Sequence, residues 1–341
     1  MRQEDRSRIE NQLQEIPTGQ LAIICHSVSS KNSTLLTEQF SAATEGKGKT
    51  ESYTIYPGIE ASYNTFFAPE VTFHHEASSS VMELFHCRGG RIGWNMHGGT
   101  AVYLGAGDLT AHSTVCCADS AMMFPLGYAE GISFSVDLHR LEEECPEILK
   151  EADLDLQRLQ AVFCSGKPVS LPACPELEGI FAPLYSINSG LRMPYLKLKS
   201  QELLLYLSSF KIDPQKQTQY FSQQTELIKE IHSLLTEHLD QRFTIEYLSK
   251  RYLINTSTLK EVFKGVYGLP IARYMKEFRV REAMRLLRET NESIAAISKQ
   301  VGYETQGKFT KAFKDVTQTL PTVYRKNLEK QQIEKRNSSE D

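Results

Sequence analysis

The spacing of apolar residues separates a strand-rich part of the chain from a helical part. Between residues 50 and 137, short segments alternate apolar and polar positions or are rich in β-branched and aromatic residues: "SYTIY", "EVTFHHE", "VMELFHC", "RIGWNM", "TAVYLG" and "GISFSVD". Glycine-rich turns such as "RGGR", "HGGT" and "GAGD" separate them. Short strands about 8–12 residues apart predict a barrel or a sandwich. Residues 1–16 and 31–43 fit either helix or irregular structure.

From Leu138 the apolar spacing becomes helical. Leu138–Phe163 is helix-like with a proline interruption, and Pro194–Lys211 begins with a proline that suits a first helical turn. Two apolar faces occur in this second segment, one with Leu196, Leu203, Leu207 and Phe210, the other with Leu198, Leu205 and Tyr206. One neighbour does not cover two faces. We therefore expect packing on the barrel plus a partner subunit, with burial inside the domain as the alternative.

A repeat follows a polar, proline-containing linker at residues 212–224. "TIEYLSKRYLINTSTLKEVFKGVYGLPIARYMK" begins at Thr244, and "SIAAISKQVGYETQGKFTKAFKDVTQTLPTVYRK" begins at Ser293. Corresponding residues lie 49–51 positions apart throughout. Such an ordered series of matches indicates two copies of one structural unit.

Each copy has the pattern of a helix–turn–helix. A hydroxyl residue caps the first helix, whose expected apolar residues are Ile245, Leu248 and Leu253 in one copy and Ile294, Ile297 and Val301 in the other. The turns are "LIN" and "GYE", and Gly302 can take a positive φ. The second helix starts at Asn255 or near Glu304–Thr305. Its apolar stripe is Leu259, Val262 and Phe263, or Phe309, Ala312 and Phe313.

Polar residues near the start of each second helix have the chemistry to reach base edges in a major groove. The stretch between the copies, Ile271–Glu289, would span about 28 Å as a helix, close to the ~34 Å of one DNA turn. Its five arginines can meet phosphates or pair with Glu277, Glu282 and Glu289. These arginines are Arg273, Arg279, Arg281, Arg285 and Arg288.

Charge favours the same partner. Residues 1–220 hold 17 Lys/Arg and 26 Asp/Glu, whereas residues 243–330 hold 17 and 9. A basic C-terminal part predicts a polyanion partner, and a solvated basic face is the alternative. The N-terminal segment lacks a signal-like apolar core, and "LLLYL" is too short to span a bilayer, so we expect a cytoplasmic protein without membrane contact. Seven cysteines without a CxxC argue against a disulfide framework or structural zinc.

Residues 224–326, with "TIEYLSKRYLINTSTLKEVFKGVYG" and "SIAAISKQVGYETQGKFTKAFKD…LPTVYR", resemble the DNA-binding domain of the AraC/XylS family of bacterial transcription regulators. The resemblance implies two helix–turn–helix motifs that read adjacent groove segments. Gly307 and Ser257 depart from the family pattern, because they offer no side chain or a short one. The expected DNA-binding residues are Ser257, Thr258, Lys260, Glu261, Gln306, Gly307, Thr310 and Lys311.

The strand-rich part, around "MHGGTAVYLGAGDLTAHS", looks like the cupin-type sensory barrel of such regulators. "VMELFHCRGGRIGWN" and "PLGYAEGISFSVDL" are loosely similar to the siderophore-sensing branch. The resemblance also assigns Leu138–Phe163 and Pro194–Lys211 to dimerisation. A small-molecule effector pocket is expected from Phe85, Trp94, Met96, Tyr103 and His112, and a core filled by these side chains is the alternative.

Metal chemistry in the barrel is not expected. His74 and His75 precede Glu76, but adjacent residues of a strand point to opposite faces. Cys87, Cys116 and Cys117 fit buried packing better than a soft-metal site.

These patterns together predict an α+β protein: an N-terminal cupin-like β-barrel with dimerisation helices, and a C-terminal all-α domain with two helix–turn–helix motifs. The expected division is residues 1–211 for effector binding and dimerisation, 212–224 for the linker, 225–330 for DNA binding and 331–341 for a polar tail. The predicted function is a cytoplasmic, effector-controlled transcription regulator without a cofactor or enzymatic activity. Its expected partners are double-stranded DNA, a small molecule, a second copy of the chain through Pro194–Lys211, and RNA polymerase. The alternatives are a metal-dependent cupin enzyme with a helical appendage, and a regulator whose barrel serves only dimerisation.

Overall fold

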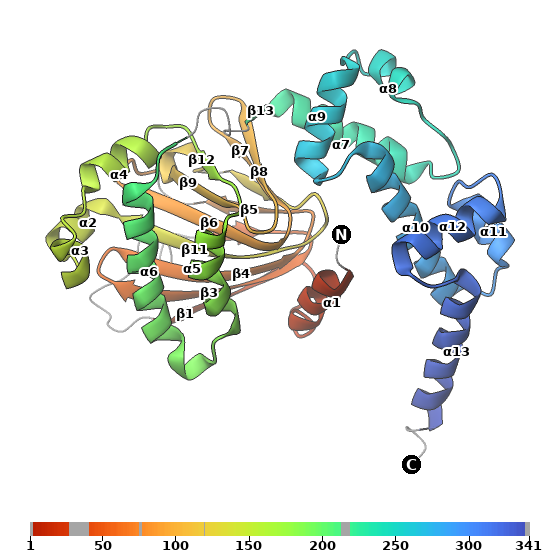
Figure 1. Ribbon diagram of the computed structural model, residues 1–341, viewed down its shortest axis with the longest axis horizontal. Coiled ribbons are helices and arrows are strands. Elements are labelled where there is room, and N and C mark those ends of the chain that lie inside the picture. The colour runs from red at the N-terminus through yellow and green to blue at the C-terminus, as the bar shows by residue number, and fades with distance from the viewer. Residues whose placement is uncertain (1–2, 27–40, 75–76, 119, 213–218, 338–341) are drawn as a thin grey trace. The chain divides into compact units, whose positions relative to one another are not determined.

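The chain forms two compact units, Met1–Gln223 (unit 1) and Gln224–Asp341 (unit 2). The computed structural model describes residues 3–26, 41–74, 77–118, 120–212 and 219–337 (Figure 1). None of the helices in these ranges is both long and apolar enough to cross a membrane.

Unit 1 is built on a seven-stranded sheet and a six-stranded sheet. The larger sheet has the order β1 (Gln20–His26), β3 (Lys47–Tyr56), β4 (Ile59–Phe67), β11 (Ala129–Asp137), β6 (Val81–Gly90), β9 (Leu109–Ser113) and β12 (Val169–Leu171). The smaller has the order β13 (Tyr220–Phe221), β8 (Thr100–Leu104), β7 (Ile92–Met96), β10 (Ala121–Met123), β5 (Glu70–His74) and β2 (Ser41–Ala43). Only the β1–β3 pair is parallel among the described pairs. The predicted strands are confirmed, whereas β1, β2, β12 and β13 lie outside the region 50–137 that the pattern indicated; β2 falls within residues 31–43, for which helix or irregular structure was expected.

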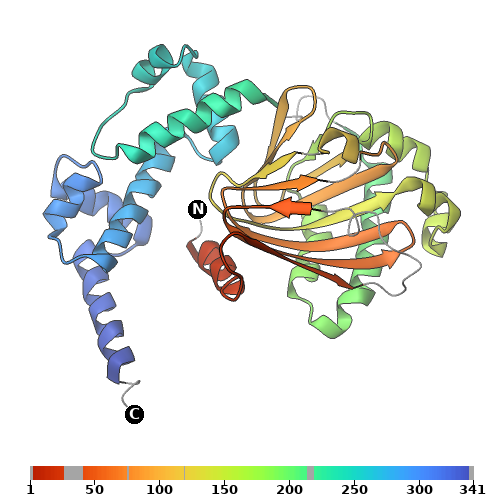
Figure 2. The same ribbon diagram turned by 180° about the vertical axis from the view of Figure 1, so that it is seen from behind.

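Helices cover one face of the larger sheet (Figures 1 and 2). They are α2 (Leu138–Glu143), α3 (Glu147–Glu151), α4 (Leu156–Phe163), α5 (Pro175–Ser186) and α6 (Arg192–Ser209). Strand residues such as Ala61, Leu84 and Phe134 share one apolar core with Phe181 and Leu203 of these helices. This core uses one alternate set of side chains from each strand, so the other set points into the space between the two sheets.

The first predicted apolar face of α6 is the buried one. Leu196, Leu203 and Leu207 are fully buried in the unit 1 core, together with Leu204. On the second predicted face Leu205 and Tyr206 pack partly against the same core, but Leu198 is 59% exposed. The helix therefore offers less spare apolar surface than its sequence pattern indicated, although Leu198 remains on it.

A short N-terminal helix, α1 (Gln3–Gln12), packs against the barrel. Ile9 of this helix and Leu13, the residue that follows it, are buried in a small cluster with Tyr128. Arg8 forms an ion pair with Glu130 of β11 at 2.7 Å between Nη2 and Oε2. An apolar contact and an ion pair thus attach this helix to the sheet.

The described part of unit 2 is helical apart from its turns. Its helices are α7 (Ser222–Glu237, which begins just before the unit boundary), α8 (Ile245–Arg251), α9 (Thr256–Tyr267), α10 (Ile271–Glu289), α11 (Ile294–Gln300), α12 (Gln306–Thr317) and α13 (Pro321–Asn337). The expected polar tail thus begins inside α13. Val280 and Leu287 of α10 pack with Ile297, Phe309 and Phe313 in a core of the second motif. The predicted fold class is confirmed: unit 1 is a double-sheet barrel with helices, and unit 2 is all-α with two helix–turn–helix motifs.

One predicted apolar position was wrong. Leu253 was expected on the buried face of the first motif, but it is 93% exposed and has φ of +50°. The helix ends at Arg251, so Leu253 falls in the turn, where the chain takes a left-handed conformation. Ile254 is the turn residue that is buried instead.

Candidate nucleic-acid interface and barrel cavity

The two motifs of unit 2 repeat each other residue by residue. Both first helices have 7 residues, and both second helices have 12. The expected N-caps are confirmed for α8 and α11, where Thr244 and Ser293 accept hydrogen bonds from backbone amides three residues on, each at 3.1 Å. In the second helices Asn255 and Thr305 are the N-caps. Because α9 and α12 start 50 residues apart, their positions can be compared directly.

Most of the predicted base-reading side chains are exposed at the start of α9 and α12. Lys260, Glu261, Gln306 and Lys311 are exposed, and they form no hydrogen bond or ion pair with the described part of the chain. Their donors and acceptors are thus available to a ligand. The carboxylate of Glu261 would accept from cytosine, the amide of Gln306 suits adenine, and the lysines suit guanine or phosphate.

The other predicted residues are less available. Ser257 is exposed but donates a hydrogen bond to Oδ1 of Asn255 at 2.6 Å, so its hydroxyl serves the helix cap. Thr258 and Thr310 are half-buried. Gly307 is exposed, and a Cβ built there would meet nothing within 4 Å. The second residue of α9 and the second residue of α12 therefore offer little side chain with which to contact a base.

The arginines of α10 have separate roles. Arg273 pairs with Glu277 at 3.2 Å, and Arg285 pairs with both Glu282 and Glu289, as expected for helical spacing. Arg279 is different because it is half-buried. Its guanidinium donates to backbone carbonyls of the loop between α7 and α8, at 3.1 Å to Leu239 and 3.0 Å to Gln241.

The turn of the second motif packs against that same loop. Gly302 has φ of +78°, as its position in the turn predicted, and a Cβ on it would lie 1.9 Å from the carbonyl oxygen of Leu239. The guanidinium carbon of Arg279 would be 3.1 Å from that Cβ. Loop, connecting helix and second turn thus meet at one point, which fixes the second motif against the segment that leads into the first.

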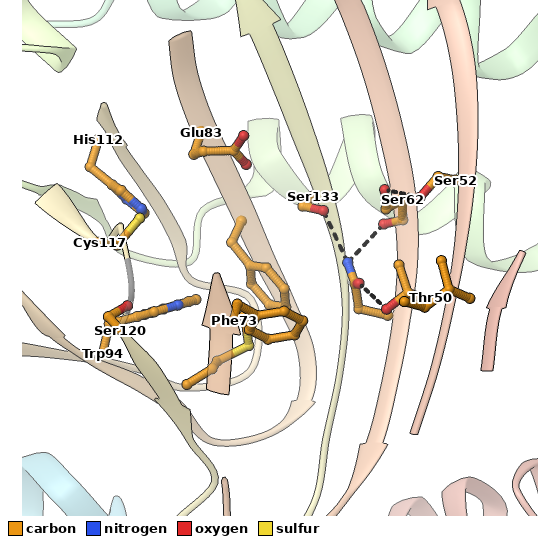
Figure 3. Close-up of a pocket in the computed structure, with 14 residues that line it drawn as sticks. Thr50, Ser52, Ser62, Phe73, Glu83, Trp94, His112, Cys117, Ser120 and Ser133 are labelled. Carbon is orange, nitrogen blue, oxygen red and sulfur yellow. Dashed lines mark hydrogen bonds between the residues drawn. The ribbon is translucent and has the colours of Figure 1, made fainter. Parts of the chain in front are cut away.

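Unit 1 contains a cavity of about 110 Å³ between its two sheets (Figure 3). Such a space is several times larger than one water molecule needs, and comparable to the ~150 Å³ of a cavity that holds a benzene ring. One wall is aromatic and is formed by Phe73, Phe85 and Trp94. The rings of Phe85 and Trp94 pack edge to face, with their centroids 5.4 Å apart. The opposite wall is polar.

The polar wall comes from the inward set of side chains on the larger sheet. Ser52, Ser62 and Ser133 lie side by side in register on β3, β4 and β11. Asn64 donates to the Ser133 hydroxyl at 3.0 Å and accepts from Thr50 at 3.1 Å. A hydroxyl–hydroxyl bond of 2.8 Å joins Ser52 to Ser62. These bonds offset part of the cost of burying polar groups.

A row of ionisable groups lies next to the serines. The register places Glu60, Ser135, Glu83 and His112 side by side across β4, β11, β6 and β9. Burial raises the pKa of Glu83 to about 8, against the opposing hydrogen bond from Ser135, and the nearby Glu60 raises it further. Burial likewise raises the pKa of Glu60 to about 7, with Arg140 opposing. Of these, Glu83 and His112 line the cavity.

Three of the five predicted effector-binding residues line this cavity: Phe85, Trp94 and His112. Met96 and Tyr103 are buried but do not line it, and the Tyr103 ring packs against Gly93 at about 2.4 Å from an ideal Cβ there. The sequence interpretation missed Glu83, Asn64 and the serines. Their signal was the polar set of alternate residues in β3, β4 and β11, which is normally attributed to solvent.

Within the described residues, no three His, Cys, Asp or Glu side chains come together as a metal site would require. His75 and Glu76 lie outside those residues. All seven cysteines are described, and none forms a disulfide; Cys87, Cys116 and Cys117 are buried, as the packing interpretation expected. Burial raises the pKa of the Cys87 thiol to about 12 and that of Cys117 further, so neither is a reactive thiolate at neutral pH.

Unit 2 is similar in sequence to known transcription regulators. A family described as a helix-turn-helix domain matches residues 248–327. The HTH-type transcriptional activator RhaR of Mannheimia succiniciproducens is 29% identical over 98 residues, which are 29% of this chain and 36% of that protein. The arabinose operon regulatory protein of Escherichia coli is 26% identical over 103 residues, 30% of this chain and 35% of that protein. The chain thus spans about a third of the length of these curated relatives.

Among solved structures, the C-terminal domain of the two-component response regulator yesN from Fusobacterium nucleatum is 31% identical. The match covers 30% of this chain and 99% of that one, with a TM-score of 0.28. The matched family and the two regulators agree with the two helix–turn–helix motifs of unit 2. The C-terminal part of the chain is therefore a helix-turn-helix DNA-binding domain of the AraC/XylS type.

Proposed function

We propose that the chain is a sequence-specific transcription regulator whose barrel cavity takes a small effector. The observation that supports DNA reading is the matched presentation of α9 and α12. Each places polar side chains at its fifth and sixth positions: Lys260 and Glu261, both exposed, in one helix, and the half-buried Thr310 and the exposed Lys311 in the other. Side chains at such positions reach base edges when the helix N-terminus enters a major groove.

Selection of bound sequences from random duplex DNA tests this proposal. The full chain should enrich a defined sequence, and its affinity should fall steeply with salt. Gln306→Ala and Lys260→Ala should each cost about 1–3 kcal/mol at particular base pairs if they read bases. Lys330→Ala, an exposed lysine of α13, serves as the matched control and should leave the preference unchanged. An equal loss on all sequences would show that these residues hold only phosphates.

We also propose that the regulator acts as a homodimer through α6 and works with RNA polymerase. The exposed Leu198 on a helix that is otherwise fixed to its own core supports the dimer. Sedimentation of Leu198→Glu tests it, because a charge in an apolar contact between subunits should shift the equilibrium toward monomer. Unchanged sedimentation, with a dimer present, would place the contact elsewhere.

The cavity favours a barrel that binds an effector over a barrel that serves only dimerisation. A buried wall of hydroxyls, an amide and carboxyls stabilises a fold less than apolar packing does. This polar wall borders a cavity of about 110 Å³, and a polar ligand in that cavity would complete the hydrogen bonds of the wall. Failure of all small metabolites to change thermal stability or DNA binding would favour the assembly role.

A further inference from the structure

The charge of the cavity wall restricts the ligand chemistry. No lysine or arginine is found among the described residues that line it, and His112 is the single lining side chain that can become cationic. An anionic ligand would meet Glu83 directly and Glu60 behind it, on the far side of Ser135; Arg140 acts on Glu60 but does not line the cavity. The wall therefore disfavours carboxylates and phosphates.

Glu83 has an unused acceptor at the cavity. Its Oε1 atom is shielded from solvent and receives no hydrogen bond from the described residues. Figure 3 shows the carboxyl group projecting from β6 into the space between the hydroxyl wall and the aromatic wall. A buried carboxyl group without a partner costs free energy, and a neighbouring cation offsets that cost through its charge and, where it carries N–H groups, also through a hydrogen bond.

The aromatic wall is suited to the same kind of group. His112 lies opposite Glu83 in the strand register, and the Trp94 ring follows at 6.1 Å from the His112 ring. The faces of indole and phenyl rings attract ammonium groups through their quadrupoles. On the other side, Ser52, Ser62 and Asn64 offer hydrogen bonds to a ligand hydroxyl or carbonyl.

We propose that this cavity binds a small organic ammonium ion that carries a hydrogen-bonding group, with its positive charge at Glu83 and its polar end on the serine and asparagine wall. A cavity of about 110 Å³ limits the ligand to roughly the size of a six-membered ring. The proposal deepens the effector part of the proposed function. Its test needs no DNA, so it can fail while DNA binding stands, and the reverse.

Matched probes separate charge from shape. Choline and 3,3-dimethylbutan-1-ol have the same size and hydroxyl, but only choline is charged. Trp94 is the only tryptophan of the chain and lines the cavity, so its fluorescence reports occupancy directly. Choline, or the smaller ethanolamine, should change the emission of the full chain and bind at least about tenfold more tightly than the neutral analogue. Equal binding of the neutral analogue, or no response to either ammonium up to about 10 mM, overturns the proposal.

Variants locate the charge. Glu83→Gln keeps the shape and removes the negative charge, so it should abolish the preference for choline over the alcohol. Glu143→Gln, at an exposed position of α2, is the matched control and should keep it. A thermal melt confirms that Glu83→Gln is folded, and the comparison of probes on the unaltered chain stands even if it is not. A preference that survives in folded Glu83→Gln overturns the assignment to this residue.

The pH profile gives a second readout. Choline keeps its charge at all pH values, so only protein groups titrate. The groups that face Glu83 are Glu60, His112 and the thiol of Cys117. Burial raises the pKa of Glu83 in the empty cavity to about 8. The affinity for choline should therefore rise about tenfold per pH unit below that value and stay constant above it. The rise should persist in His112→Gln and vanish in Glu83→Gln; the opposite result assigns the effect to the histidine and overturns the proposal.

Discussion

Replacing Gly302 by alanine is the sharpest test of how the second motif is held. The new Cβ would stand 1.9 Å from the carbonyl oxygen of Leu239, so the loop between α7 and α8 would have to move. That loop is held by Arg279, whose guanidinium donates to the carbonyls of Leu239 and Gln241. The residue would also keep φ of +78°, which side chains disfavour.

The magnitude follows from these two effects. A left-handed conformation costs a non-glycine residue about 1–2 kcal/mol. Breaking one hydrogen bond to the charged guanidinium costs about 1.5–3 kcal/mol. We therefore expect Gly302→Ala to lower the free energy of unfolding of unit 2 by about 2.5–5 kcal/mol, a large part of the ~5–15 kcal/mol of an ordinary domain.

Two optical probes distinguish the units during urea unfolding. Trp94 is the only tryptophan and lies in unit 1, so its emission follows unit 1 alone, whereas far-ultraviolet circular dichroism follows the helices of both units. The part of the dichroism change that does not coincide with the Trp94 transition belongs to unit 2; its midpoint should fall and the Trp94 midpoint should stay. Gly307→Ala is the matched control, since its Cβ meets nothing within 4 Å in the helix α12, and it should stabilise by about 0.5–1 kcal/mol. A loss below about 1 kcal/mol for Gly302→Ala would refute the steric reasoning.

Other predictions use the same urea assay. Leu253→Gly should raise the stability of unit 2 by about 1 kcal/mol, because the exposed leucine has φ of +50° and buries almost nothing; a loss would mean that its side chain has a contact to give up. Phe313→Ala should cost about 3–5 kcal/mol, because the ring is fully buried in the second motif, and a cost below about 1 kcal/mol would contradict that packing. Burial, aided by Arg281, lowers the pKa of His232 to about 4. As pH falls, the histidine therefore takes up a proton in the unfolded chain before it does so in the folded one. The free energy of unfolding of unit 2 should decrease by about 2–3 kcal/mol between pH 6.5 and pH 4. Replacement of His232 by phenylalanine should flatten that loss, and an unchanged pH dependence would assign it to other groups.

The helical unit could be predicted from sequence because its signals are local. Caps, apolar stripes and the glycine turn each occupy a few neighbouring residues, and the repeat shows each of them twice. The caps Thr244 and Ser293 and the positive φ of Gly302 were all found where the pattern placed them. What failed was Leu253, because the pattern matched it with Val301, whereas its structural counterpart is Gly302, 49 residues later, which also has a positive φ. The first helix ends at Arg251, and its turn uses a left-handed leucine instead of glycine.

The cavity was harder to predict because it depends on which side of a sheet is inside. Alternation in β3, β4 and β11 gives one apolar and one polar set of residues, and polar sets are usually assigned to solvent. In this barrel the apolar set faces the helices, so Ser52, Ser62 and Asn64 face inward. Only the long-range pairing that brings β3, β4, β11 and β6 together places Glu83 beside them. No local pattern contains that information.

The different side chains of α9 and α12 lead to a prediction about the DNA sequence that the chain binds. Their capped starts are equivalent, but their side chains are not: the fifth and sixth positions are Lys260 and Glu261 in α9, and Thr310 and Lys311 in α12. Lysine and glutamate together prefer a guanine and a cytosine N4 donor, whereas threonine and lysine favour a thymine methyl and a guanine.

One chain should therefore bind two different short sequences, about 10–10.5 base pairs apart if both helices enter successive turns of the major groove. Selection from random DNA should return an asymmetric site. Exchanging Lys260 and Glu261 for threonine and lysine should make its two halves more alike. A site that is already a perfect repeat with the unaltered chain would show that these positions do not determine the sequence.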